Sequence, residues 1–266
     1  MGNTVKFAVI GLGEAGGLIA AGLAAAGGDV IGFDVAKPKN ARVPMAESAE
    51  EAVAQADVVL SLNSSTVALR VAEGVAGSLK PGAIYADLNT GTPSLKRNLA
   101  AALPDGCFVD VAVMKPVPGL AEKVPCGIAG PAAKRFEELM APLGMNLEYV
   151  SEQPGDAAAR KLIRSIVAKG MAALIIDTLW AAKSMGMEDW AIAEIKNEFD
   201  TSSSATVQRY LDGTAKHAKR RSVEMTDVVE MLADSKYDST MVNGVSLTLS
   251  HVMHGRKIPF AKPTDD

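Results

Sequence analysis

Short β-rich runs alternate with helical runs up to about residue 150, and this alternation constrains the fold more than any other feature of the sequence. The β-rich runs are Val5–Ile10, Val30–Phe33, Val58–Leu62, Ala83–Asp87, Cys107–Val111 and Val124–Ala129, and the helical runs are Leu18–Ala26, Ser48–Gln55, Thr92–Leu103 and Pro131–Leu143. Strands that alternate with helices form crossover units, which build a largely parallel sheet with helices on its faces. The pattern therefore predicts a doubly wound α/β domain.

The alternation stops at Gly155, and the rest of the chain has a helical pattern. Asp156–Ser184 contains no Pro and a single Gly, so it predicts one helix that is longer than an ordinary globular helix. Further helices are expected at Met187–Phe199, Ala205–Leu211, Thr214–Ala233 and Ser239–His254. We place the boundary at Gln153-Pro154-Gly155. This predicts an α/β domain over residues 1–154 and an all-α domain over residues 155–266, entered through the long helix.

Composition excludes several classes of function. The chain has 266 residues, 48% of them hydrophobic, and a formal net charge of −4, so it offers no overall attraction to nucleic acid or to an anionic membrane. Its apolar runs are shorter than the roughly 20 residues of a membrane-spanning helix, and its start, MGNTVKFAVIGLG, lacks the pattern of a signal peptide. Cys107 and Cys126 form no CxxC pair and are expected to be buried, reduced thiols. We therefore expect a cytoplasmic protein that binds neither nucleic acid nor a membrane.

Three glycines directly follow the first predicted strand. Gly11, Gly13 and Gly16 form the pattern GxGxxG between a strand and a helix, which is the context of a Rossmann-type dinucleotide site. The first glycine permits a tight turn, the second lets a pyrophosphate approach the backbone, and the third lets the helix pack against the strand. The N–H groups that open the helix then face the phosphates. The predicted cofactor-binding residues are Gly11, Leu12, Gly13, Glu14, Ala15 and Gly16, together with Asn63 and Ser64 after the third strand.

The second strand ends at Asp34, which predicts how the ribose of the cofactor is recognised. A carboxylate about 20 residues beyond the glycines accepts hydrogen bonds from the adenosine ribose hydroxyls. It would repel a 2′-phosphate, so NAD is the expected cofactor. Three cations that follow closely, Lys37, Lys39 and Arg42, would favour NADP if they bound that phosphate, and NADP stays the alternative.

Four motifs occur in the chain at spacings that match one enzyme family. They are the glycine motif, Asp87-Leu88-Asn89-Thr90-Gly91-Thr92-Pro93, Asp110-Val111-Ala112-Val113-Met114-Lys115-Pro116, and Gly155-Asp156-Ala157-Ala158-Ala159-Arg160-Lys161. The last three resemble D-x-S-T-x-x-P, D-A-P-V-S-G-G and G-x-G-x-x-x-K of the β-hydroxyacid dehydrogenase superfamily, which includes 6-phosphogluconate and 3-hydroxyisobutyrate dehydrogenases. The helical part resembles a less-studied branch with a phosphogluconate-dehydrogenase-like C-terminal domain.

The resemblance implies which residues are catalytic. In the family, the Lys of the last motif is the acid/base and an Asn one helical turn later contacts the substrate, which assigns these roles to Lys161 and Ser165. The two residues are four positions apart and share a helical face. Oxidation of an alcohol removes the hydroxyl proton as hydride leaves carbon, and a lysine can accept that proton once burial lowers its pKa. Asn89, in place of the family's Ser, and Thr90 are expected to hold the substrate by hydrogen bonds.

The third motif departs from the family at the small turn that contacts the substrate. Met114, Lys115 and Pro116 replace Ser-Gly-Gly, and Pro116 has no N–H to donate. In one interpretation the Lys115 ammonium pairs with an anionic group of the substrate. In the other, Lys115 points to solvent and Met114 lines an enlarged apolar pocket. Both residues are therefore candidates for substrate binding.

A basic run, Lys216–Arg221, lies in the helical half. It is either a solvated helix face or a site that captures a carboxylate or phosphate of the substrate, across a dimer interface as the resemblance implies. Arg220 and His217 are the candidates, because the planar fork of an Arg matches such groups. His251 and His254 have no acidic or Cys companions, so no metal site is expected.

The all-α half has too little sheet to pack against, so its helices are expected to bury apolar surface against a second subunit. This predicts a homodimer or a higher homo-oligomer, as the resemblance also implies. Trp180 and Trp190 are expected to pack in a core or at that interface.

The expected function is oxidation of a small, anionic hydroxyacid, or reduction of the matching carbonyl. Alternatives on the same scaffold are imine reduction and oxidative decarboxylation, and a different class is a non-catalytic NAD(H)-binding sensor. The presence of Lys161 argues against the imine reductases that lack this lysine. A sensor would not need Lys161 or the Asn89–Thr90 pair. The sequence does not identify the substrate or the direction of the reaction.

Overall fold

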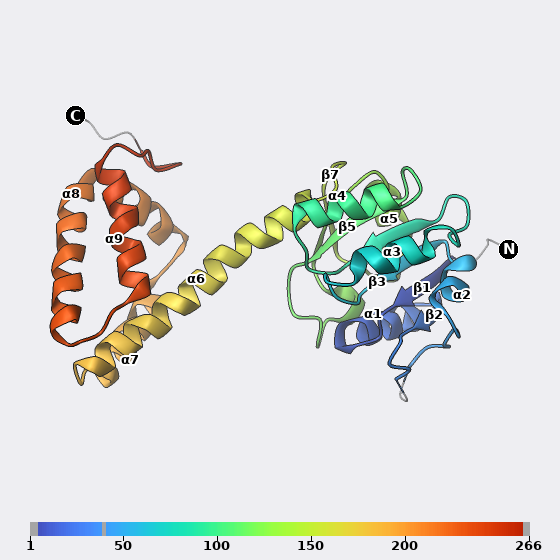
Figure 1. Ribbon diagram of the computed structural model, residues 1–266, viewed down its shortest axis with the longest axis horizontal. Coiled ribbons are helices and arrows are strands. Elements are labelled where there is room, and N and C mark those ends of the chain that lie inside the picture. Colours follow the sequence, from blue (N-terminus) through green and yellow to red (C-terminus); the bar gives the residue numbers. More distant parts are fainter. Residues whose placement is uncertain (1–4, 39–40, 263–266) are drawn as a thin grey trace. The chain divides into compact units, whose positions relative to one another are not determined.

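The computed structural model describes residues 5–38 and 41–262. One compact unit ends at Ser165 and a second begins at Ile166. The division falls inside helix α6, Asp156–Ser184, whose first residues therefore belong to the first unit (Figure 1). The boundary that the sequence predicts, at residues 153–155, coincides with the start of this helix.

The first unit is built on a seven-stranded sheet in the order β2-β1-β3-β4-β5-β6-β7. The strands are β1 Lys6–Ile10, β2 Asp29–Phe33, β3 Val58–Ser61, β4 Ile84–Asp87, β5 Phe108–Val113, β6 Cys126–Ala129 and β7 Leu147–Ser151. Neighbouring strands are parallel except β5 and β6, which pair antiparallel. The strand order runs outward in opposite directions from β1 and β3, and ligands of such sheets bind outside the carboxyl ends of the strands at this switch point. The predicted doubly wound α/β fold is confirmed.

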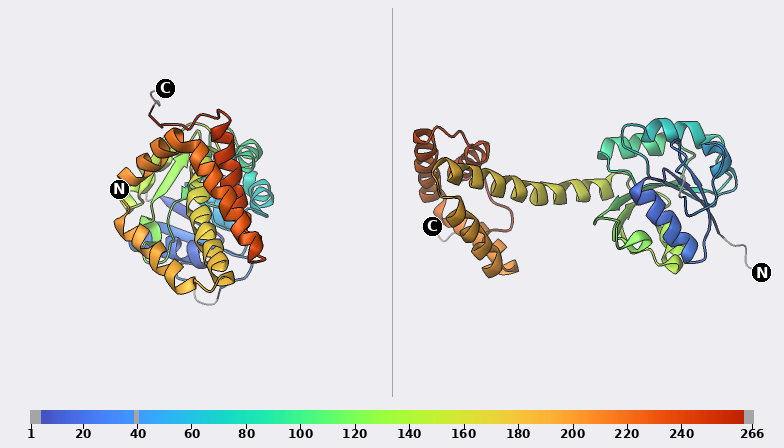
Figure 2. Two further views of the ribbon diagram at one scale, coloured as in Figure 1. Left: turned by 90° about the vertical axis from the view of Figure 1, so that its left-hand side faces the viewer. Right: turned by 90° about the horizontal axis from the view of Figure 1, so that it is seen from below.

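Helices cover both faces of the sheet (Figure 2). They are α1 Glu14–Ala25, α2 Ala49–Ala54, α3 Ala68–Ala76, α4 Pro93–Ala102 and α5 Ala133–Met140, with short 3₁₀ turns at Ala121–Lys123 and Ala141–Leu143. Alternate residues of a strand point to opposite faces. Phe7 and Val9 accordingly join a core with α1 and α5, whereas Ala8 and Ile10 join a core with α2, α3 and α4.

The predicted alternation missed one helix and one strand. Helix α3 was missed although Ala, Leu, Arg and Glu favour a helix and its buried residues Ala68, Ala72 and Val75 recur at helical spacing. Strand β7 is a five-residue strand at the edge of the sheet, where every residue is at least partly exposed, so its pattern is weak.

The second unit contains the rest of α6 with α7 Glu188–Thr201, α8 Ser204–Asp234 and α9 Thr240–Met253. Helix α8 consists of two helical segments that meet at a kink at His217 (φ −121°, ψ 26°). They correspond to the two helices predicted at residues 205–211 and 214–233, with the break a few residues later than predicted. No helix among the described residues is both long and apolar enough to cross a bilayer.

Asp177 of α6 anchors the connection between α8 and α9. Its buried carboxylate accepts hydrogen bonds from the hydroxyl groups of Tyr237 (2.5 Å) and Ser239 and from the N–H of Met241 (3.1 Å). Burial alone would raise the pKa of Asp177, but these hydrogen bonds hold it below its usual value. The carboxylate thus joins the long helix to the last two helices.

Both cysteines are buried and unpaired, as predicted. Burial raises the pKa of the Cys126 thiol to about 12, although the positive charge of Lys161 lowers it somewhat. A thiol in such surroundings stays protonated and unreactive near neutral pH. Trp180 and Trp190, in the second unit, are 59% and 62% exposed, so they lie outside the core of that unit.

Candidate active site

The glycine turn after β1 has the backbone that its three glycines predict. Gly11 has φ +94°, and a Cβ there would lie 2.5 Å from the carbonyl oxygen of Leu62. A Cβ on Gly16 would lie 1.9 Å from the carbonyl oxygen of Gly11, so this glycine packs α1 onto the turn. A Cβ on Gly13 would meet no atom within 4 Å. Gly13 caps α1 without a side-chain hydrogen bond, which leaves open backbone and helix N–H groups of the kind that hold a pyrophosphate.

A pocket of about 540 Å³ adjoins this turn. Its lining includes Gly11, Gly13, Asp34, Asn63 and Ser64 from the predicted cofactor set. The other predicted cofactor residues do not line this pocket. Gly16 is buried in helix packing, and Ala15 packs against the core. Leu12 and Glu14 line a neighbouring pocket. Sequence reasoning missed Arg70 of α3, which lines the larger pocket and lies in the helix that was not predicted.

Asp34 is fixed by two backbone hydrogen bonds. The N–H of Leu12 donates to Oδ2 at 2.7 Å, and the N–H of Ala36 donates to Oδ1 at 2.7 Å. A carboxylate has about four lone-pair sites, so it can still accept bonds from ribose hydroxyls. The two bonds hold the carboxylate in place just after β2.

Two of the three cations that would favour NADP, Lys37 and Arg42, do not line the larger pocket. Lys37 pairs with Glu47 at 3.3 Å on an exposed loop, and Arg42 lines the neighbouring pocket. Lys39 lies outside the described residues.

The substrate motif meets the start of α6. The Lys161 ammonium donates to Oγ1 of Thr90 at 2.8 Å. Asn89 donates through Nδ2 to Asp87 Oδ1 (2.5 Å) and to Asn63 Oδ1 (3.2 Å), which ties it to the loop of the cofactor pocket. The structure thus brings together two residues predicted to bind substrate, the predicted catalytic lysine and one residue predicted to bind the cofactor.

A buried ion cluster underlies this junction. Lys96 of α4 is 1% exposed, and its ammonium lies 2.6 Å from Asp87 Oδ2 and 3.1 Å from Asp110 Oδ1. Burial raises the pKa of the Asp87 carboxyl, and the charge of Lys96 opposes this effect. Oδ2 of Asp110 accepts the N–H groups of Gly155 (3.2 Å) and Ala158 (2.9 Å), which open α6.

The altered turn has an unpredicted neighbour. Met114 packs on a small cluster of Ala112, Ala129 and Ala157, and its carbonyl oxygen accepts a hydrogen bond of 2.6 Å from Nη1 of Arg164. Lys115, the next residue, is exposed. Arg164 lies three positions after Lys161 and so shares its helical face. Its position three residues after Lys161 did not single out Arg164 in the sequence, because arginines are common on exposed helix faces.

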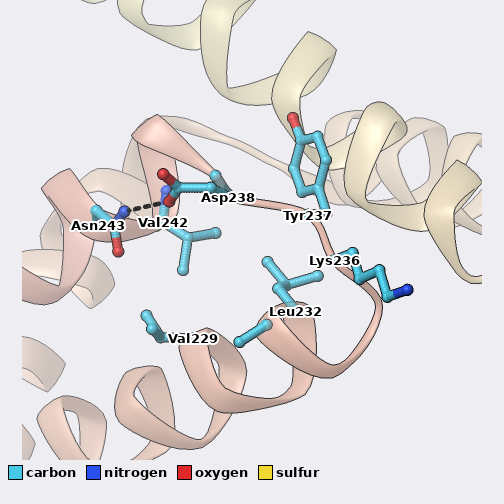
Figure 3. A pocket seen from close by; sticks show the side chains of 9 residues that line it. Val229, Leu232, Lys236, Tyr237, Asp238, Val242 and Asn243 are labelled. Atoms are coloured by element: carbon cyan, nitrogen blue, oxygen red, sulfur yellow. Dashed lines mark hydrogen bonds between the residues drawn. The ribbon is translucent and has the colours of Figure 1, made fainter.

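The remaining candidates lie further along the chain. Ser165 follows Arg164 on α6, whereas His217 and Arg220 belong to the second unit, where Arg220 pairs with Glu224 at 3.6 Å. The second unit also contains a pocket of about 290 Å³, in which Asn243 donates to Asp238 (Figure 3). None of the predicted site residues lines that pocket.

Comparison with known proteins identifies the family. The family described as the NAD binding domain of 6-phosphogluconate dehydrogenase matches residues 6–140, which is just over half of the chain. The chain belongs to this family. A domain of unknown function, DUF1932, matches residues 182–252. The chain is therefore an NAD-binding oxidoreductase of the 6-phosphogluconate dehydrogenase type, with a second domain to which no activity is attached.

Several solved structures resemble this chain over most of its length. A conserved hypothetical protein from Sinorhizobium meliloti 1021 is 32% identical, with 98% of this chain and 92% of that chain covered and a TM-score of 0.64. A conserved protein of unknown function, described as similar in structure to 3-hydroxyacid dehydrogenases, is 26% identical over 94% of this chain and 97% of that chain, with a TM-score of 0.62. The V8 variant of an imine reductase from Myxococcus stipitatus, in complex with NAD+, shares the fold (TM-score 0.79) at 15% identity, with 95% of this chain and 94% of that chain covered.

The departures from the family motifs have structural reasons. Gly155, the first glycine of the lysine motif, has φ +103°, and a Cβ there would lie 2.8 Å from the carbonyl oxygen of Pro93. Ala157 stands at the second glycine of the motif and is buried in the small cluster beneath Met114, where an alanine fits. The motif therefore keeps its glycine where the backbone requires one.

Proposed function

We propose that this protein oxidises a small hydroxyacid, or reduces the matching carbonyl, with Lys161 as the general acid/base. The observation that carries the proposal is the 2.8 Å hydrogen bond between Lys161 and Thr90, beside Asn89 and the cofactor loop. A nicotinamide dinucleotide would be held by the glycine turn, Asp34 and the Asn63–Ser64 loop, and when bound it supplies the acceptor or donor of hydride.

The residues of the chain would divide the remaining work. Lys161 takes the proton of the substrate hydroxyl at Nζ, or returns it to the oxygen in the reverse direction. Thr90 orients the ammonium and Asn89 orients the substrate. Because a carboxylate only accepts hydrogen bonds, Asp87 fixes which end of the Asn89 amide faces it and directs the carbonyl oxygen of that amide the other way. Ser165 is placed by the lysine motif to contact the same substrate.

We expect NAD to be the preferred cofactor. Asp34 is held in place by Leu12 and Ala36, so it cannot avoid a 2′-phosphate. Steady-state kinetics should give the higher kcat/KM for NAD, and Asp34→Ser should narrow the difference by relieving the repulsion. A higher kcat/KM for NADP in the unaltered protein would contradict this expectation and point to Arg70 or Arg42.

The substrate should be an anion. Neither Arg164 nor Lys115 forms an ion pair among the described residues. Nη1 of Arg164 donates to the Met114 carbonyl oxygen, and the other N–H groups of the guanidinium can bind a carboxylate. Lys115 is exposed, so its contribution should be smaller and sensitive to salt.

We expect Arg164→Met to raise the KM for an acid substrate by about tenfold or more, because a charge-assisted, bidentate contact is lost. Arg164→Lys should recover only part of this loss, since it restores the charge without the fork. Lys115→Met should raise the KM by about fivefold or less, and the loss should shrink as ionic strength rises. Unchanged KM values at low ionic strength in both methionine variants would exclude anion binding at this turn.

We also propose that the protein is a homodimer or a higher homo-oligomer. Large apolar side chains are exposed along the helices of the second unit, among them Ile166, Met171, Ile176, Trp180, Trp190, Phe199 and Leu247. An apolar surface of this extent is unusual for a monomer. Light scattering should report an oligomer at micromolar concentration, and Trp180→Asp should weaken it. Leu120→Asp, at an exposed apolar position of the first unit, is the matched control. A stable monomer in the unaltered protein would refute the proposal.

A substrate screen tests the function directly. NADH formation should be followed with hydroxyacids, including aryl-substituted and phosphorylated ones, and NADH consumption with cyclic imines. Turnover of a hydroxyacid is the expected result. Turnover of imines alone would assign the protein to imine reduction, and tight NADH binding without any turnover would assign it to the sensor class.

A further inference from the structure

Lys96 is the most buried cation of the first unit's site region, and its surroundings are unusual. Its side chain is 1% exposed and lies between two aspartates that are each 0% exposed. Two carboxyl groups thus share one ammonium inside the protein. Such a cluster is weak support for stability, since well-packed apolar residues often do as well. Stability alone therefore does not explain why Lys96 is buried here, which favours an additional role for it.

Each aspartate extends the cluster toward a different part of the candidate active site. Asp87 accepts the amide N–H of Asn89, which adjoins Thr90. Asp110 accepts two N–H groups at the start of α6, one turn before Lys161. Oδ1 of Asp110 makes no hydrogen bond and faces the Lys96 ammonium at 3.1 Å, so its burial depends on that charge.

The two helices involved also touch directly. Lys96 sits one turn into α4, and the first residue of that helix, Pro93, packs so closely on Gly155 that no Cβ would fit there. The ammonium additionally donates to the carbonyl oxygen of Asp87 at 2.9 Å, which fixes the backbone at the end of β4. Through Asp87 and Asp110, the Lys96 ammonium is thus linked both to the Asn89–Thr90 turn and to the start of α6.

We propose that Lys96 is a positioning residue for catalysis. It holds the Asn89–Thr90 turn and the start of α6 at the spacing that places Lys161 against Thr90 and the substrate. Lys96 itself is buried and transfers no proton. The proposal rests on the function proposed for Lys161, because the consequence of misplacement is a slower proton transfer. A shift of about 1 Å in reacting groups can cost on the order of a hundredfold in rate.

The test compares Lys96→Met with Leu99→Ala. The first removes the charge at similar volume, and the second destabilises the same helix at a fully buried apolar position outside the cluster. Thermal unfolding, the Kd for NADH, kcat and amide hydrogen exchange are measured in both. In Lys96→Met we expect kcat to fall about a hundredfold with the Kd for NADH nearly unchanged. We also expect exchange at Gly155 and Ala158 to rise by roughly tenfold, while β1 and α1 keep their protection. Leu99→Ala should lower the melting temperature and retain kcat.

Two results would overturn the proposal: a retained kcat in Lys96→Met, or equal losses of kcat in both variants, which would mean that Lys96 acts only through stability. If Lys96→Met does not fold, Asp110→Asn replaces it, because an asparagine keeps an oxygen for the α6 N–H groups but loses the pairing with Lys96. It should lower kcat in the same direction. If the protein turns over no hydroxyacid, the function proposed above fails, but the exchange comparison still decides. Unchanged protection at Gly155 and Ala158 in Lys96→Met would then reject the positioning role.

Discussion

Replacing Lys161 with alanine is expected to lower kcat by about 10²–10⁴-fold, which is the usual contribution of a general acid/base. The ammonium contacts Thr90, which does not line the cofactor pocket, and it acts in proton transfer, so the Kd for NADH should change by about twofold at most. Single-turnover kinetics and NADH fluorescence titration measure the two quantities separately. A wild-type kcat in the alanine variant would remove Lys161 from the mechanism.

Three further variants sharpen the test of Lys161. Lys161→Arg keeps the charge but cannot give up its proton, so it should be as slow as the alanine variant. Thr90→Val removes the oxygen that Lys161 contacts at nearly constant shape and should lower kcat by a smaller factor. Lys183→Ala changes an exposed lysine at the far end of the same helix and should retain full activity. Loss of activity in Lys183→Ala would show that the rate responds to helix α6 in general rather than to Lys161.

Alanine at Gly13 and at Gly16 should have opposite consequences. A Cβ on Gly13 meets no protein atom, so the fold should be unaffected, but the methyl group occupies the space through which a pyrophosphate approaches the turn. We expect the Kd for NAD to rise by at least about tenfold, or about 1.4 kcal/mol, with the melting temperature unchanged. A Cβ on Gly16 would overlap the carbonyl oxygen of Gly11, and neither backbone segment can move freely. This variant should lose about 2–4 kcal/mol of stability.

Differential scanning fluorimetry without cofactor and calorimetric titration with NADH separate the two effects. Each variant serves as the control for the other, since both add one methyl group within the same turn. Unchanged affinity in Gly13→Ala would mean that the dinucleotide lies elsewhere. Unchanged stability in Gly16→Ala would show that α1 can shift away from the turn, contrary to the packing seen here.

The parts of the site that the sequence predicts are those built from neighbouring residues. The glycine turn needs a strand, a tight turn and a helix within eleven residues, Lys6–Gly16, and each of these leaves a local pattern. Lys161 was identified differently, from the resemblance of the Gly155–Lys161 motif to the family's G-x-G-x-x-x-K. Arg164 and Arg70 left no such pattern. Arg164 is an exposed residue of a long helix, where arginines are common, and Arg70 lies in α3, which was not predicted from the sequence.

Local order along the chain determined the doubly wound fold and the glycine turn, because hydrophobic periodicity and glycine placement act over a few residues. Tertiary structure alone decided that Lys96 is buried between Asp87 and Asp110, residues 9 and 14 positions away along the chain from it. In the sequence Lys96 lies in a helix beside Arg97, where a solvated lysine is the ordinary expectation. Its burial depends on Asp87 and Asp110 lying opposite each other on neighbouring parallel strands and on the N–H groups at the start of α6 meeting one of the aspartates. Such an arrangement depends on how distant segments pack, and no local pattern records it.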